Sequence, residues 1–195
     1  MLKIPPVLCV SVFGRIPDVQ QTVSADFKQV GNSVFLVGQR DVTEMAGSVL
    51  YRLLNHKSTR LPQLDLTMFP RVCQGIHQAI VQGKILACHD ISEGGLAAAV
   101  AEMCFGGNMG VRLSLPPGIL PASFLFNETA GCFLVEAENE AALQDALGDV
   151  PCVCIGCTVK EPVVSLYNHD DKLFAISLEG LKSAWQGPMK EVFGD

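Results

Sequence analysis

Short runs of apolar and β-branched residues, separated by glycine, proline, asparagine and charged residues, recur along the chain and predict strands. The expected strands cover residues 7–16, 33–37, 84–88, 111–115, 132–137, 150–159, 163–167 and 172–176. The last two flank Asn168-His169-Asp170-Asp171, whose residue types favour a hairpin turn. We therefore expect these two strands to pair with each other.

Apolar residues spaced three and four apart predict helices in between. The expected helices cover residues 43–54, 65–82, 92–105 or 95–105, 139–147 and 178–193, and residues 18–27 are ambiguous. In the last helix Leu181, Trp185, Met189 and Val192 share one face, which we expect to pack inward. These strands and helices, interleaved without strict alternation, favour a mixed sheet covered by helices. The predicted fold class is α+β, with residues 1–195 forming a single domain.

The composition is typical of a globular protein. Of the 195 residues, 49% are hydrophobic and 17% are charged, and the formal net charge is −6. Without a run of lysines or arginines, sequence-independent binding to nucleic acid has no electrostatic basis. No apolar stretch approaches the roughly 20 residues needed to cross a bilayer, and the N-terminus lacks the pattern of a secretion signal. We therefore expect a cytoplasmic chain that binds neither nucleic acid nor membrane.

Eight cysteines could form a disulfide framework or a metal site. Most of them lie inside apolar strand or helix patterns, which favours buried, reduced thiols. Cys152-x-Cys154-x-x-Cys157 is the one metal-like spacing. On a strand, Cys152 and Cys154 share a face and Cys157 points away, unless Gly156 forms a bulge. Because no fourth ligand is evident nearby, strand packing is favoured over a zinc site.

The segment His89-Asp90-Ile91-Ser92-Glu93-Gly94-Gly95-Leu96 concentrates polar groups and glycines directly before a predicted helix. The first N–H groups of a helix and its dipole favour an anionic ligand such as phosphate. Asp90 and Glu93 would repel a bare anion, so a magnesium-bound phosphate with Asp90 as metal ligand is preferred. An alternative is purely structural: Asp90 or Ser92 caps the helix and the glycines permit close packing. His89 at a strand end is more typical of a hydrogen-bonded structural residue than of a base.

A second polar segment, Phe126-Asn127-Glu128-Thr129, precedes the predicted strand 132–137. Its polar side chains could hold a ligand or could build a turn by bonding to the local backbone. The other histidines, His56, His77 and His169, have no partners at catalytic spacing. No phosphate-binding P-loop, nucleophile elbow or Rossmann fingerprint occurs in the chain. The residues alone therefore do not define a complete active site.

The segment from His89 to Met103 resembles the signature of the C-terminal domain of phosphoribosylformylglycinamidine synthases, a family in the aminoimidazole ribonucleotide synthetase superfamily. The resemblance extends over nearly the whole chain, at Pro6-Val7, Asp18-Val19, Asp26-Phe27-Lys28, Ala46-Gly47-Ser48 with Tyr51, Phe126-Asn127-Glu128 with Gly131, Ile155-Gly156 with Val159, Leu178-Glu179-Gly180-Leu181 and Trp185. Two residues depart from the family pattern. Cys132 stands where an arginine is often found, and Glu93 stands where aspartate is common.

The resemblance implies a role in purine synthesis, in which the family converts formylglycinamide ribonucleotide, ATP and glutamine-derived ammonia to formylglycinamidine ribonucleotide with magnesium. It also implies a nucleotide or substrate cleft faced by His89, Asp90, Ser92, Gly94, Gly95, Asn127 and Glu128, with Asp90 as the candidate metal ligand. The family is built from two superfamily halves, and the resemblance does not say whether this cleft belongs to the working site or to a structural nucleotide.

In the family, the ATP-binding domains and the catalytic histidine lie upstream of this domain. We therefore expect no catalytic residue in this chain, no activity from the chain alone, and two partners, which are the upstream ATP-binding half and a glutaminase domain or subunit. Surface that packs on the missing half would favour self-association into a homo-oligomer. Two alternatives stay open. One is another superfamily enzyme, such as thiamine-monophosphate kinase, selenophosphate synthetase or a hydrogenase maturation factor, and the other is a free-standing, non-catalytic binding module.

Overall fold

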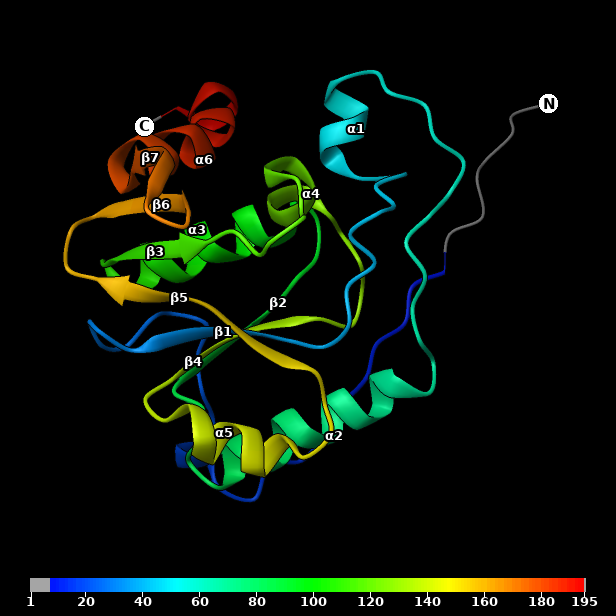
Figure 1. Cartoon of the computed structure of the whole chain (residues 1–195), viewed down its shortest axis with the longest axis vertical. Helices are drawn as coiled ribbons and strands as arrows, with labels where there is room; N and C mark the ends of the chain where they lie inside the picture. The colour runs from blue at the N-terminus through cyan, green and yellow to red at the C-terminus, as the bar shows by residue number, and fades with distance from the viewer. Residues whose placement is uncertain (1–7, 195) are drawn as a thin grey trace.

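A seven-stranded mixed sheet lies between two layers of helices in the computed structural model, which describes residues 8–194 (Figure 1). The strands are β1 (Ser33–Val37), β2 (Ala87–Asp90), β3 (Gly110–Ser114), β4 (Phe133–Ala137), β5 (Cys152–Val159), β6 (Val163–Asn168) and β7 (Asp171–Ser177). The helices are α1 (Val49–Leu53), α2 (Met68–Val81), α3 (Gly95–Gly107), α4 (Pro121–Phe126), α5 (Glu140–Leu147) and α6 (Leu178–Phe193), with a short 3-10 turn at Val19–Gln21. The predicted α+β class is confirmed.

The strand order is β2-β4-β1-β5-β3-β6-β7, and every pair is antiparallel except β3 with β6. Residues 163–168 and 171–177 form the hairpin that the turn residues predict. Val37 lies opposite Phe133, and Phe133 lies opposite Asp90. The ends of β1 and β2 and the start of β4 therefore meet at one end of the sheet. The connections that leave this end carry both candidate polar segments.

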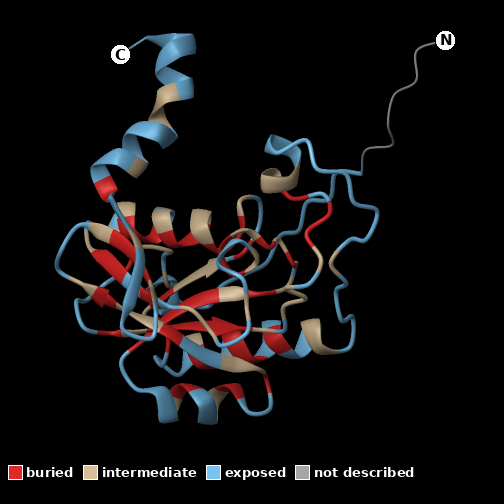
Figure 2. Ribbon diagram, turned by 45° about the horizontal axis from the view of Figure 1, so that its top comes forward, coloured by how far each residue is buried: buried red, intermediate tan, exposed pale blue. Residues whose placement is uncertain are grey.

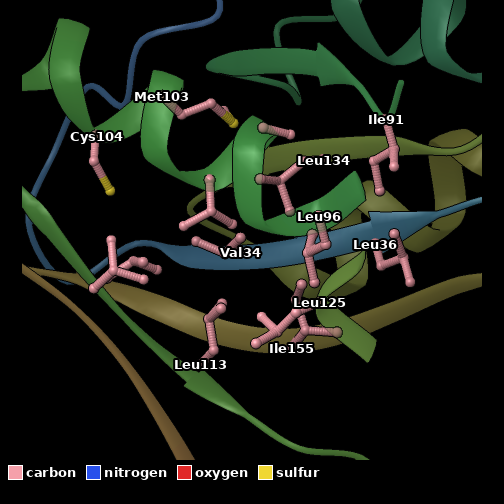
Figure 3. Close-up of a cluster of buried hydrophobic side chains, with 14 of the residues drawn as sticks. Val34, Leu36, Ile91, Leu96, Met103, Cys104, Leu113, Leu125, Leu134 and Ile155 are labelled. Carbon is pink, nitrogen blue, oxygen red and sulfur yellow. The ribbon is translucent and has the colours of Figure 1, made fainter. Parts of the chain in front are cut away.

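Two apolar cores fill the space between the sheet and its helices. On one face, Leu96 and Met103 of α3 pack with strand residues that include Val34, Leu113 and Leu134 (Figure 3). On the other face, residues of α2 and α5 pack against β1 and β4, the largest of them being Phe35, Val37, Val72, Ile76, Val135, Leu143 and Leu147. The alternation of side chains along β1, with Val34 and Phe35 in different cores, is the period-two pattern of a sheet covered on both faces.

A buried carboxylate, Glu136, organises the chain before β1. Its side chain is fully buried, and it accepts hydrogen bonds from the backbone N–H groups of Lys28 (2.6 Å) and Gln29 (3.0 Å) and from Nδ2 of Asn32 (2.7 Å). A buried charge is tolerated only where hydrogen bonds replace its water. Since Glu136 lies on β4 and its donors precede β1, these bonds fix how the chain enters the sheet.

Three predicted elements differ from the structure. Residues 8–16 form no strand, and Leu8, Val12 and Phe13 are exposed; Val7 lies outside the described residues. The predicted helix 43–54 is reduced to α1, because Gly47 adopts a left-handed φ of 82° and Ser48 caps the helix behind it. Helix α4, which begins at Pro121, is not among the helices that the sequence predicts.

Helix α6 departs from its predicted packing. It projects from the body (Figure 2), and Trp185, Met189 and Val192 are exposed by 59%, 62% and 72%. The prediction that this face packs inward is therefore wrong for these three residues. Only the first turn of the helix contributes a fully buried residue to the core, Leu178. The Trp185 ring still touches the ring of Phe105 at a centroid distance of 5.7 Å.

The eight cysteines are free thiols within residues 8–194. Five of them are buried or half-buried, as the apolar patterns predict, and Cys9, Cys73 and Cys154 are exposed. Strand β5 contains a bulge, since Gly156 lies opposite Val34 while Cys154 lies opposite Phe35. In the part of the chain that the structure describes, no group of three or more His, Cys, Asp or Glu side chains is arranged to hold a metal. Among the described helices, none has the length and apolar character to span a bilayer.

Replacement of Glu136 should destabilise the fold. We expect Glu136→Ala to lower the free energy of unfolding by about 3 kcal/mol, because the substitution leaves buried N–H donors without an acceptor. Glu136→Gln, which retains one carbonyl oxygen, should cost less. Urea denaturation followed by circular dichroism measures both. Glu138→Gln, at an exposed neighbouring position, is the matched control, and equal midpoints for Glu136→Ala and this control would contradict the assigned role.

Burial should also separate the thiols by reactivity. Burial raises the pKa of Cys88 and of Cys104 to about 12, and the thiolate is the reactive form. At pH 8, iodoacetamide should therefore modify the exposed Cys73 and Cys154 well before these two thiols. Because their folded-state pKa values lie above the ordinary value of 9.0, their contribution to stability is complete below pH 9 and declines as the pH rises towards 12. Peptide mass spectrometry after timed labelling checks the order, and simultaneous labelling of all four would contradict it.

Candidate functional site

Three chain connections converge at the end of the sheet where β1 and β2 finish and β4 begins. The first joins β1 to α1 (residues 38–48), the second joins β2 to α3 (residues 91–94), and the third joins α4 to β4 (residues 127–132). The antiparallel register of β4 with both neighbours brings these connections together. The two polar segments predicted from the sequence, which are far apart along the chain, are thus in contact.

The carboxylate of Glu128 joins two helix starts. Its Oε1 accepts hydrogen bonds from the backbone N–H of Val49 (2.8 Å), the first residue of α1, and from that of Gly94 (2.9 Å), the N-cap of α3. These N–H groups and the positive end of the α3 dipole are what an anionic ligand would otherwise use. Glu128 therefore occupies part of the anion-binding position that the sequence predicts at the start of α3.

Gly94 and Gly95 have a steric reason to be glycine. Both have left-handed φ angles, of 83° and 66°. A Cβ on Gly95 would lie 2.7 Å from the carbonyl oxygen of Leu125 and 2.9 Å from that of Asn127. The start of α3 packs directly against the end of α4, and only glycine permits this approach. The geometry thus supports the structural interpretation of the glycine pair and leaves its place in a ligand cleft as a prediction.

Asn127 is fully buried and fixes the β1–α1 connection. Its Nδ2 donates to the carbonyl oxygens of Asp41 and Glu44, both at 2.7 Å. Its Oδ1 accepts from the backbone N–H (3.1 Å) and the hydroxyl (2.7 Å) of Thr129. Every polar group of the Asn127 amide is therefore used inside the protein, and its contribution to a cleft is to hold residues 41–44 in place.

Asp90 and Ser92 are the predicted site residues that face solvent. The Ser92 hydroxyl donates to Oδ2 of Asp90, and the Asp90 side chain is 62% exposed. Mg²⁺ is commonly held by one or two protein carboxylates together with phosphate oxygens and water. Among the predicted site residues, Asp90 is the one whose carboxylate is exposed, which fits a magnesium ion that a nucleotide brings with it. In the described part of the chain, no group of three such side chains is arranged to hold a cation with protein ligands alone.

His89 bridges the end of β2 and the middle of α3. Its Nδ1 lies 2.7 Å from the carbonyl oxygen of Asp90, and its Nε2 lies 2.8 Å from Oε2 of Glu102. Both ring nitrogens are therefore engaged by groups of the protein, which favours the structural role.

Arg40 is a central residue that the sequence reasoning missed. Its guanidinium donates from Nη1 to the carbonyl oxygen of Phe124 and from Nη2 to that of Asn127, both at 2.9 Å, while its buried Nε has no partner within the described residues. Burial lowers the pKa of Arg40 to about 10, so the group stays charged at neutral pH. It lies close enough to Cys132 to interact with it electrostatically. A cation shortly after a buried strand was the available signal.

Removal of the Glu128 carboxylate should release the start of α1. This helix has five residues and no fully buried side chain, so it has little stability of its own. We expect Glu128→Ala to increase the rate of amide hydrogen exchange at Val49 and Gly94 by about tenfold, because each amide loses a charge-assisted hydrogen bond. Glu128→Gln, which keeps an acceptor oxygen, should have a smaller effect. Exchange is measured by NMR with the exposed Glu138→Gln as control, and unchanged protection at both amides in Glu128→Ala would refute the assignment.

Comparison with curated proteins finds similarity along almost the entire chain. The chain is 30% identical to the phosphoribosylformylglycinamidine synthase subunit PurL of Deinococcus radiodurans over 99% of its own length and 27% of that protein. Against the same subunit from a Synechococcus strain the identity is 33%, over 92% of this chain and 25% of that protein. The chain thus spans about a quarter of the length of the curated relatives it matches.

Solved structures share the fold. Thermotoga maritima PurL complexed with FGAR superimposes with a TM-score of 0.68 at 15% identity, covering 83% of this chain and 29% of that chain. HypE of Escherichia coli gives a TM-score of 0.56 at 20% identity, covering 80% of this chain and 52% of that chain. At such identities the likeness shows the architecture alone.

The three connections that meet at this end of the sheet all lie in the part of the chain that one family model matches. The model of the family described as AIR synthase related protein, C-terminal domain, matches residues 29–168. This range includes the β1–α1 connection, the His89–Leu96 segment and Asn127-Glu128. Because the match covers well over half of the chain, the protein belongs to the family of AIR synthase related C-terminal domains.

Proposed function

We propose that the chain is the C-terminal domain of a phosphoribosylformylglycinamidine synthase. The parent enzyme would convert formylglycinamide ribonucleotide, ATP and glutamine-derived ammonia to formylglycinamidine ribonucleotide. The observation that carries this proposal is the similarity to synthase subunits over 99% of this chain, at 30% identity. The likeness to HypE extends to the fold alone and gives no comparable support to a different superfamily enzyme.

The domain would supply one wall of a cleft for a magnesium nucleotide or a phosphorylated substrate. Asp90 is the candidate metal ligand, and Ser92 lies beside it. The wall behind them is built by Gly94, Gly95, Asn127 and Glu128, and His89 anchors the end of β2. ATP and Mg²⁺ would bind between this wall and the upstream half, and the nucleotide phosphates would supply most of the magnesium ligands. We assign no catalytic residue to this chain.

The proposal makes the chain dependent on partners. The upstream ATP-binding half would carry the reacting groups, and a glutaminase domain or subunit would supply ammonia, so the chain alone would be inactive. The solved structure of PurLQS from Thermotoga maritima is consistent with a multi-subunit parent. The exposed apolar face of α6 supports self-association of the separate chain. The cytoplasm is the proposed location.

Complementation in trans tests the proposal. We expect this chain, mixed with the upstream half of a synthase, to restore ATP hydrolysis that depends on formylglycinamide ribonucleotide and ammonia. Asp90→Asn should lower the restored rate by about tenfold or more, because the magnesium-bound phosphate loses its protein ligand. Phosphate release measured with each component omitted in turn provides the readout.

The control for this experiment is Asp149→Asn, which removes an exposed carboxylate paired with Arg71, away from the three convergent connections. It should restore the same rate as the unchanged chain. An unchanged rate in Asp90→Asn with an intact fold would refute the assigned metal ligand. Failure of all variants to restore activity, although both halves are folded and associated, would refute the proposed function.

A further inference from the structure

The connection between α1 and α2 is a long exposed segment that crosses from one helical layer to the other (Figure 1). Residues 55–65 contain no regular secondary structure, and all of them are exposed except Pro62, which is half-buried. Exposed connecting segments of this kind are often functional. We call residues 55–65 the strap.

Both ends of the strap are anchored. At the start, Asn55 has a left-handed φ of 52°, the His56 N–H donates to the carbonyl oxygen of Tyr51 (2.8 Å), and the His56 ring contacts the Tyr51 ring. At the other end, Oδ1 of Asp65 accepts from the N–H groups of Thr67 (2.8 Å) and Met68 (3.0 Å). The strap therefore has two fixed pivots, one on α1 and one on α2.

The middle of the strap is held loosely. Within residues 8–194, the ion pair between Nε of Arg60 and Oε1 of Glu44, at 3.0 Å, is the only polar contact that joins residues 57–64 to the rest of the protein. Leu61 additionally lies against the turn at Gly47, and Leu64 lies against Gly131. The ion pair is asymmetric, since the Arg60 side chain is 80% exposed and the Glu44 side chain is 14% exposed. The Arg60 side chain thus reaches from the strap to a largely buried carboxylate.

Two adjoining cavities lie between the strap and the β1–α1 connection. One, of about 360 Å³, is lined by Gln39, Arg40 and Asp41 on one side and by residues 63–65 of the strap on the other. The second, of about 430 Å³, is lined by Asp41, Glu44 and residues 59–61 and 63 of the strap. The protein-facing wall is rigid, because Asn127 and Thr129 hydrogen-bond to the backbone of residues 41–44. Only the strap side of these cavities is free to move.

We propose that residues 57–64 form a lid over these two cavities, hinged at Asn55-His56 and at Asp65 and closed by the Arg60–Glu44 ion pair. Leu61 lies against Gly47, in the turn that precedes α1. Gly47 is two residues before Val49, whose amide is held by Glu128, so the closed lid covers the approach to that helix start. Opening exposes Asp41 and Glu44 without disturbing either apolar core, since no strap residue belongs to them. This conformational equilibrium belongs to the chain itself and does not depend on the reaction proposed above.

Limited trypsin digestion of the whole chain tests the lid, because Lys57 and Arg60 place two cleavage sites inside it. Breaking the ion pair with Glu44→Gln should increase the rate of cleavage after Lys57 and Arg60 by about two- to fivefold, the effect expected of a pair with one exposed partner. Arg60→Gln should increase cleavage after Lys57 by a similar factor. Mass spectrometry of timed samples gives the rate at each site. Since Arg60 is 80% exposed, its replacement leaves the fold intact.

Asp149→Asn, which breaks the comparable surface pair with Arg71, is the control and should leave cleavage within the strap unchanged. Equal cleavage rates after Lys57 in the unchanged chain and all three variants, or an increase in only one of the two ion-pair variants, would contradict the role of the Arg60–Glu44 ion pair in closing the lid. Cleavage after Arg112, which lies in β3 between two paired strands, requires the sheet to unfold. Strap cleavage that rises with urea only in parallel with cleavage after Arg112 would overturn the lid, because the strap would then open only by global unfolding.

Discussion

The hydrogen bonds of the Glu128 carboxylate determine how the end of the sheet that carries the candidate site is assembled. One oxygen accepts the first N–H of α1 and the N-cap N–H of α3, and Glu128 itself lies on the connection that leads into β4, so three segments remote in sequence are tied at one atom. Asn127, Arg40 and Glu136 act in the same way on other irregular backbone. Each side chain supplies the hydrogen-bond partner that the irregular backbone would otherwise find in a strand or a helix. A loop can be buried only when its backbone groups have such partners. The rigidity of these connections, and the freedom of the strap beside them, follow from where such side chains are placed.

The sequence predicts the sheet well and its irregular edges poorly. Strands such as β1 and β4 have continuous apolar runs because both faces are covered, and their hydrophobic pattern is sufficient to locate them. The run at residues 8–16 is also rich in apolar residues but has no neighbouring strand to pair with in the described chain, and a local pattern cannot report that. The apolar face of α6 has helical spacing whether it meets a core or solvent, so its exposure could not be predicted either.

The candidate site shows the same limit. Residue types single out His89, Asp90, Asn127 and Glu128, and the structure brings them to one end of the sheet, but their contacts differ in kind. Asn127, Glu128 and His89 are directed at the protein, whereas Asp90 and Ser92 are directed at solvent. Composition cannot distinguish a polar group that builds a wall from one that faces a ligand, because both need oxygen and nitrogen atoms. The distinction depends on which backbone groups lie within reach, and these belong to segments 34, 79 and 86 residues away.

In the proposed function, this wall would bear on which form of phosphate can bind beside Asp90. With the α3 N-terminus partly neutralised by Glu128, a phosphate arriving without a cation finds fewer free amides and the negative charge of Asp90 in front of them. A phosphate that carries magnesium would reverse this balance, because the cation would convert Asp90 from a repulsive group into a ligand. In the proposed function, the internal carboxylate that assembles the fold would thus also favour a magnesium-bound phosphate over a bare one. Structural and ligand-directed roles are separate for each residue but coupled through the shared helix start.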